Sequence, residues 1–312
     1  MKTNLSRRAA WSALCCAALL WMGGCASRNA ARSEGTGHIP PVRVYPMAPE
    51  PYPAPAAPEA AKPPETPLPP ETRYAQGHVV ILTHGDEAEA QSLLKEAVGT
   101  LSDLKKLLKL TPSDTLLTIH LFDTRPILLA YMAVASPGPV DSDAVCFYTP
   151  QGGVIALARQ SNPQETLRLL RHQVAGFAVT DRFLEAPPWI REGLAFYFES
   201  GPPYGLPNDA ALDQLRGEAE ERMEGALAAL VNVPPQGTLD AKGVARAWAL
   251  TQFLMTQTED GPAAMKKYLD QVHVGEPPVA QFAHAFGVPP SELEPAWRLY
   301  LAQMAAPAKN GD

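Results

Sequence analysis

A proline-rich segment near the amino terminus constrains the fold of this chain more than any other feature. Thirteen of the 33 prolines among its 312 residues lie between Pro40 and Pro70. Proline has no backbone N–H to donate and a restricted φ, so the segment favours an extended polyproline conformation over helix or sheet. We expect residues 25–73 to form a linker, with a docking site for a proline-binding partner as the alternative. The folded domain is then expected over residues 74–305, followed by a disordered tail at 306–312.

The amino terminus has the pattern of a secretory signal peptide. Basic residues at positions 2–8 precede an apolar run at 9–22, which is shorter than the roughly 20 residues of a transmembrane helix. Two glycines then precede Cys25, which resembles the bacterial lipoprotein signal, where this cysteine becomes the lipidated first residue of the mature chain. The pattern predicts a signal peptide over residues 1–24 and contact with the membrane through lipidated Cys25. An uncleaved membrane anchor is the alternative.

Either alternative places the folded domain outside the cytoplasm. Ala26 and Ser27 follow Cys25, so the position after the cysteine lacks an aspartate. By analogy with lipoprotein sorting in bacteria with two membranes, this favours the outer membrane, on its periplasmic side. We therefore expect a membrane-anchored lipoprotein of the bacterial cell envelope.

Charge and cysteine content exclude some classes of protein. The net charge of −7 argues against a nucleic-acid partner, which needs a basic surface. Cys146 is the one cysteine beyond Cys25, so no disulfide can hold the mature domain together and a hydrophobic core must do so. We interpret Cys146 as a small buried residue in a strand, since no nearby histidine pattern supports a catalytic thiol.

Hydrophobic periodicity predicts an α+β fold. Strands are expected at 78–83, 116–122, 144–148 and 154–158, and a short helix at 126–135. A long helix should open with the capping residues Asp86 and Glu89 and carry an apolar stripe to Leu108. From Asn162 onward only helices are expected. The sequence thus predicts a small mixed β-sheet with a long helix, followed by an all-helical half.

The first helix of that second half carries an altered metal-binding motif. The H-E-x-x-H motif of zinc peptidases places two histidines one helical turn apart, with a glutamate after the first. Here His172 occupies the first position, Gln173 replaces the glutamate, and Gly176 replaces the second histidine. The next helix, after two prolines at 187–188, presents Glu192, with Glu199 on the same face two turns later.

These segments together resemble the peptidase MA-like domain, a gluzincin-type family known mainly as bacterial domains of unknown function. The resemblance covers roughly residues 77–301, and its most specific part is the Trp-x-x-Glu-Gly-Leu-Ala stretch that begins at Trp189. It implies a zincin, thermolysin-like fold. In active relatives the two helix histidines and the glutamate matching Glu192 bind zinc, and the glutamate within the helix motif is the general base.

Carried over to this chain, the resemblance implies a vestigial metal site without a catalytic residue. His172 and Glu192 keep two ligand positions, but Gly176 has no side chain, and a catalytic zinc usually needs three protein ligands. Gln173 is neutral and cannot act as the base, although it can hydrogen-bond a ligand. Two further interpretations stay open: Gly176 permits close helix packing, and His172 is a hydrogen-bonded structural histidine.

Two hypotheses about function follow. The favoured one is a non-catalytic binding or scaffold module without a cofactor, which holds a peptide, protein or cell-wall ligand in the former substrate groove. The alternative is an active metal-dependent peptidase with a rebuilt zinc site, whose third ligand would come from His84, His120 or Glu199.

Overall fold

The computed structural model describes residues 71–110, 113–135, 140–206, 208–215, 225–258, 260–272 and 276–305. The predicted signal peptide, the lipidated Cys25, the linker up to residue 70 and the tail at 306–312 lie outside the described residues. Within the described part, no helix has the length and apolar character needed to cross a membrane.

The described residues form strands first and helices afterwards. The strands are β1 (Thr72–Gln76), β2 (Val79–Thr83), β3 (Leu117–Phe122), β4 (Ala144–Thr149) and β5 (Gly152–Ala158). The helices of the first half are α2 (Glu87–Leu108) and α3 (Arg125–Ala135). Those of the second half are α4 (Pro163–Arg182), α5 (Pro188–Glu199), α6 (Asp209–Leu215), α7 (Ala226–Val231), α8 (Ala241–Gln257), α9 (Gly261–Gln271), α10 (Pro278–Phe286) and α11 (Pro290–Ala305). The predicted α+β class, with an all-helical second half, is confirmed.

The five strands form one mixed sheet in the order β1-β2-β3-β5-β4. The three central strands are parallel, and the two edge strands run antiparallel to their neighbours. Strand β1 differs from the sequence-based expectation, because it begins at Thr72 inside the predicted linker. Tyr74 is the one half-buried residue of this edge strand, and its four other residues are exposed. The strand therefore lacks the alternation of apolar and polar residues from which a strand is predicted.

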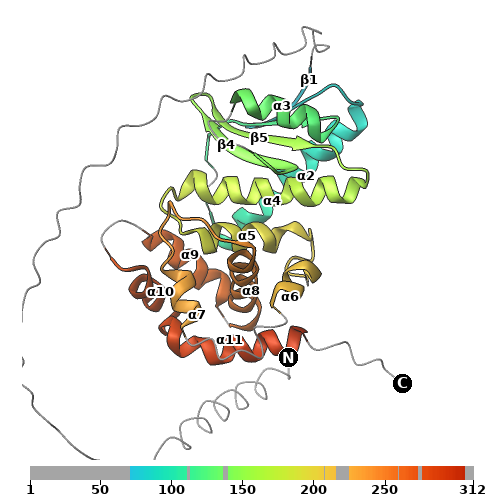
Figure 1. Cartoon of the computed structure of the whole chain (residues 1–312). Helices are drawn as coiled ribbons and strands as arrows, with labels where there is room; N and C mark the ends of the chain where they lie inside the picture. The colour runs from blue at the N-terminus through green and yellow to red at the C-terminus, as the bar shows by residue number, and fades with distance from the viewer. Residues whose placement is uncertain are drawn as a thin grey trace, which may run out of the picture. The chain divides into compact units, whose positions relative to one another are not determined.

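The helices cover the two faces of the sheet unequally. Helix α3 lies over one face, whereas α2 and the long α4 lie against the other (Figure 1). On the α2 and α4 side, residues such as Ile81, Ile119 and Ile155 pack against Leu94 of α2 and Leu170 of α4. The first core of the domain therefore lies between the sheet and this pair of helices.

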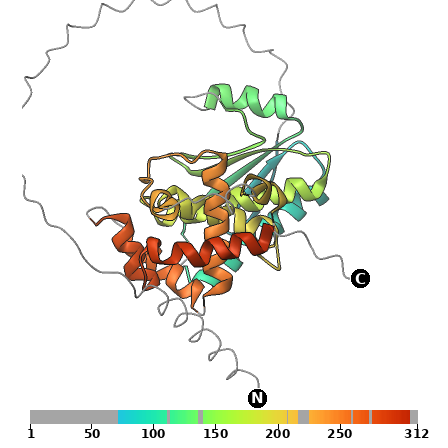
Figure 2. The ribbon, with the colours of Figure 1, turned by 60° about the horizontal axis from the view of Figure 1, so that its bottom comes forward.

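Helix α4 is also buried on a second side. Its residues Leu170, Val174 and Phe177 belong to the core under the sheet, whereas Ala175 and Val179 belong to a second core. That second core is made by α5, α8 and the helices around them, and Figure 2 shows the helices of this half from a second direction. Helix α4 thus joins the two cores of the domain.

Capping residues set the starts of α2 and α4. The Asp86 carboxylate accepts a hydrogen bond from the Glu89 N–H at 2.8 Å, and the Asn162 side chain accepts one from the Gln164 N–H at 3.0 Å. Both caps were expected. The capping box at Asp86 also predicts a return hydrogen bond from the Asp86 N–H to the Glu89 carboxylate, and this contact is replaced. The Glu89 carboxylate instead accepts hydrogen bonds from Arg159, which follows β5 in the chain. A tertiary ion pair has displaced the local contact that the sequence predicts.

The contact between α5 and α8 depends on a glycine. A Cβ added to Gly193 would lie 2.1 Å from Thr251 Oγ1 and 2.6 Å from the Ala247 carbonyl oxygen. At Gly176, by contrast, a Cβ would meet only the Ala195 Cβ, at an ordinary 3.9 Å. The interpretation that Gly176 permits close helix packing is therefore wrong, and that role belongs to Gly193.

A pair of glycine-to-alanine substitutions tests this assignment. We expect Gly193→Ala to lower the free energy of unfolding by about 1–3 kcal/mol, because the backbone of α8 must move away. Gly176→Ala should instead raise it by up to about 1 kcal/mol through helix propensity. Thermal denaturation of the two full-length variants, followed by circular dichroism, measures both. Equal effects of the two changes would contradict the assignment.

Candidate functional site

His172 lies between two carboxylates of the next helix. Helix α5 runs back along α4, so Glu192 and Glu199, two turns apart, lie on either side of the imidazole. The His172 Nδ1 is 2.7 Å from Glu199 Oε1, and its Nε2 is 3.7 Å from Glu192 Oε2. The ring of Phe196 packs edge-on against the imidazole, with 4.8 Å between centroids. These contacts hold the ring in one orientation.

The Glu199 carboxylate is the most buried acidic group of the site. Its side chain is 6% exposed, and it also pairs with Arg168, one turn before His172 on α4. The backbone carbonyl of Glu199 accepts a hydrogen bond from Arg171 at 2.6 Å, and the same guanidinium donates to Glu96 of α2 at 2.6 Å. A carboxylate only accepts, so the bond to His172 requires a proton on Nδ1. The Nε2 edge of the ring then faces Glu192.

Arg168 links the buried carboxylate to a more exposed one. Hydrogen bonds to Glu165, together with the charge of Glu199, raise the pKa of the Arg168 guanidinium. The same hydrogen bonds lower the pKa of the Glu165 carboxyl. Sequence reasoning missed Arg168 and Arg171 as parts of the site. Their positions could have indicated this role. Arg168 precedes His172 by four residues and Arg171 by one, in a helix whose other face is apolar.

The residues at this position do not fit a catalytic zinc with three protein ligands. His172 Nε2 and Glu192 face one another, but Gly176 contributes no donor. Across the residues that the structure describes, no group of three His, Cys, Asp or Glu side chains is placed to hold a metal ion. The Gln173 side chain points elsewhere, since its Nε2 donates to the Ala144 carbonyl oxygen at 3.4 Å.

The replacement ligands considered from the sequence do not complete the site. Glu199 is close, but it binds Nδ1, the ring nitrogen opposite Nε2. His120 lies on β3 beside Phe122 and Tyr131, on the sheet face opposite α4, with its Nδ1 3.4 Å from Glu71. His84 does not line the groove beside His172. The interpretation of His172 as a hydrogen-bonded, partly buried histidine agrees with its 17% exposure.

A groove of about 740 Å³ opens beside His172. Its walls come from α4, α5, α6 and α8, and include Arg168, Gln173 and Glu199 but not Glu192. Apolar side chains and alanines alternate there with amide and hydroxyl groups: Leu169, Phe196, Leu206, Ala211, Val244, Gln214, Asn208 and Ser200. Since Arg168 and His172 are paired with carboxylates, the groove presents hydrogen-bonding groups and apolar surface with its charges largely compensated.

Cys146 takes no part in this site. It lies in β4, half-buried against the core beneath the sheet. Burial, with a smaller contribution from the charge of Asp181, raises the pKa of the Cys146 thiol to about 12. The thiol is therefore protonated near neutral pH, which agrees with its interpretation as a structural residue.

Comparison with known proteins adds no relative to these observations. No family model matches the chain, and no curated protein matches it at a significant level.

Removing Glu199 should destabilise the domain far more than removing Glu165, although Arg168 contacts both. Glu199→Ala removes the acceptor of the His172 Nδ1–H, whose side chain is 17% exposed, and one of the two carboxylates that bind Arg168, so we expect a loss of about 2–3 kcal/mol. Glu165 is 39% exposed, and an exposed pair contributes at most about 1 kcal/mol. Chemical denaturation of both full-length variants measures the difference. Equal losses would show that burial of Glu199 carries no weight.

Proposed function

We propose that this chain is a lipid-anchored protein of the bacterial cell envelope whose folded domain is a non-catalytic relative of zinc metallopeptidases. Its task would be to bind a peptide, a protein segment or a cell-wall peptide in the groove beside His172. One observation carries the proposal: the helix that resembles a peptidase motif presents His172 towards Glu192, while Gln173 and Gly176 occupy the base and second-ligand positions.

The hydrogen-bond network of the site supports binding without turnover. Glu199 accepts from both His172 and Arg168, so a carboxylate of the protein fixes the orientation of the imidazole. A general base must lie within hydrogen-bond reach of the proton that it removes. Gln173 has no basic group, and its amide is engaged with the Ala144 carbonyl. The arrangement keeps the shape of a site without supplying a proton acceptor at the expected position.

The groove itself supports a peptide-like ligand. A volume of about 740 Å³ falls within the roughly 300–1,000 Å³ of ligand pockets. Peptide backbones need both donors and acceptors, which the amides of Gln214 and Asn208 can offer. Because the charged groups are already paired, a strongly charged ligand would gain little there. A peptide with small or apolar side chains fits these walls best.

A working metal site is the second candidate, and one contact favours it. Metal-binding histidines commonly donate their other ring N–H to a carboxylate, which orients the ring and raises its basicity. The bond from His172 Nδ1 to Glu199 has this form. Under this candidate His172 Nε2 and Glu192 would be two of the ligands, and zinc would supply Lewis-acid activation of water when bound.

The zinc content of the purified full chain separates the two candidates. The proposed function predicts well below one zinc per chain after dialysis, and no peptidase activity that a chelator abolishes. A functioning site should hold about one zinc per chain. Elemental analysis of the full chain, with a casein-derived peptide assay run with and without chelator, gives both values. Zinc near one per chain with chelator-sensitive cleavage would reject the proposal.

Restoring the motif should restore metal binding. The space around Gly176 accepts a side chain, because an added Cβ would meet only the Ala195 Cβ at 3.9 Å. We therefore expect the double variant Gln173→Glu with Gly176→His to bind about one zinc per chain. Zinc should also raise its midpoint of thermal unfolding.

The control is the same double change with His172→Ala, which should bind no zinc. If the double variant folds but its metal content equals that of the control, the geometry has moved too far from a zinc site, and the proposed descent from a metallopeptidase is wrong.

The lipid anchor makes a separate prediction. Replacement of Cys25 by serine removes the thiol that carries the lipid, so we expect Cys25→Ser to move the protein from the membrane fraction to the soluble fraction. Cys146→Ser is the matched control and should leave the protein in the membrane fraction. Fractionation of bacterial cells followed by immunoblotting measures the distribution. Membrane retention of the Cys25→Ser chain would favour an uncleaved anchor instead.

A further inference from the structure

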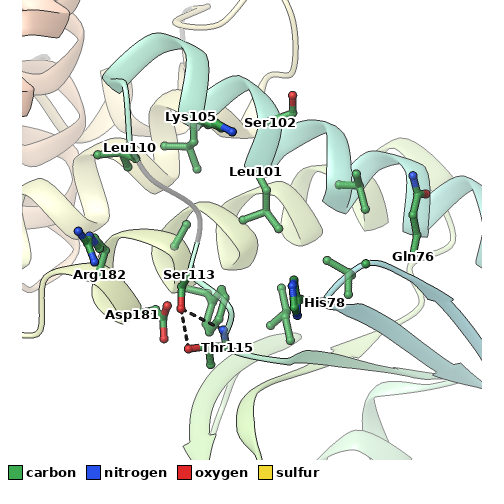
Figure 3. Close-up of a pocket in the computed structure, with 17 residues that line it drawn as sticks. Gln76, His78, Leu101, Ser102, Lys105, Leu110, Ser113, Thr115, Asp181 and Arg182 are labelled. Atoms are coloured by element: carbon green, nitrogen blue, oxygen red, sulfur yellow. Dashed lines mark hydrogen bonds between the residues drawn. The ribbon is translucent and has the colours of Figure 1, made fainter.

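A second cavity, separate from the groove at His172, lies at the amino-terminal end of the parallel strands. It measures about 430 Å³ and lies between α2 and α4, where Val79 of β2 and Leu117 of β3 begin the sheet (Figure 3). None of its lining residues is shared with the groove beside His172. The two spaces can therefore be tested independently.

The inner walls of this cavity are apolar. Val98, Leu101 and Leu104 of α2 face Phe177 of α4, and Leu110 lies at the end of the cavity. Leu104 and Leu110 belong to the core of the helical half, whereas Phe177 belongs to the core beneath the sheet. The cavity thus lies at the boundary between the two cores.

Apolar side chains that line a cavity make fewer dispersion contacts than those within a filled core, because protein interiors pack as densely as organic crystals. An apolar ligand would restore those contacts at Leu101, Leu104 and Phe177 without removing any hydrogen bond that the structure contains, because these side chains have no polar atoms. The walls consequently favour a hydrocarbon occupant over water.

The rim of the cavity adds a charge preference. Lys105 of α2 and Arg182 of α4 appear at the end of the cavity near Leu110 in Figure 3, and Gln76 and His78 appear at the other end. Asp181 also lines the cavity, so its lining residues include two cations and one carboxylate. The lining residues therefore carry one net positive charge.

We propose that this cavity binds a single alkyl chain with an anionic head group, as in a medium-chain fatty acid. The chain would lie along Val98, Leu101 and Phe177, and the head group would meet Lys105 and Arg182 at the mouth. The volume is near the lower end of the range for ligand pockets, about 300–1,000 Å³, which suits one chain rather than the two of a phospholipid. The assignment is independent of the function proposed for the groove.

Calorimetric titration of the full chain tests this proposal, with the protein kept in a detergent that has a steroid tail so that no alkyl detergent competes. The probes are dodecanoate and its neutral analogue dodecanol. We expect dodecanoate to bind about tenfold more tightly than dodecanol, because two exposed cations meet its head group. Equal affinity for the two probes, or no binding of either, would overturn the proposal.

Three variants locate the site. Lys105→Met with Arg182→Met should weaken dodecanoate binding about tenfold and leave dodecanol unchanged, and both residues are exposed, so the fold should persist. Lys95→Met, on an exposed position of the same helix away from the cavity, is the matched control and should change neither affinity. Leu101→Trp should fill the cavity and abolish binding of both probes while the protein keeps its thermal midpoint.

Two results would contradict the location or the ligand class. Undiminished dodecanoate binding by a folded Leu101→Trp variant would place the site elsewhere. Displacement of dodecanoate by phosphatidylglycerol at lower concentration than by decanoate would show that a diacyl lipid, not a single chain, is the occupant.

Discussion

The burial of α4 on two sides is the constraint on which the rest of the structure depends. One side packs under the sheet through Leu170 and Val174, and the other packs against the helical half through Ala175 and Val179. Helix α2 also reaches both cores, with Leu94 beneath the sheet and Leu104 in the helical half, and it packs against α4. A helix held in this way cannot rotate without disrupting a core, so His172, which projects between these two sides, has a position set by packing.

The same constraint explains why the site is built from ion pairs. The part of α4 that faces α5 carries Arg171 and His172, and their buried polar groups are satisfied by Glu96 and Glu199. Buried charges must be paired or hydrogen-bonded, so Glu199 has a structural role whether or not a metal is ever bound. These hydrogen bonds and ion pairs tie α5 to α4 through Glu199.

Much of the fold could be predicted because its elements carry strong local signals. The Asp86 and Asn162 caps, the alternation of β3 and the apolar stripe of α4 each predict one element correctly. Strand β1 was missed because an exposed edge strand needs little hydrophobic pattern. The partner of Glu89 was missed because Arg159 is 70 residues away in the chain, and such pairs are created by the sheet rather than by spacing.

For the candidate site, the sequence by itself determined that Gly176 has no donor atom and Gln173 no basic group, whatever the fold. It also predicted that Glu192 and Glu199 share a face of one helix, since helical periodicity is local. Only the tertiary structure decided that Glu199 binds His172 Nδ1, that Gly193 rather than Gly176 permits close packing, and that a cavity lies between the two cores. These outcomes depend on how separate helices meet, and packing between distant segments is not encoded in the spacing of neighbouring residues.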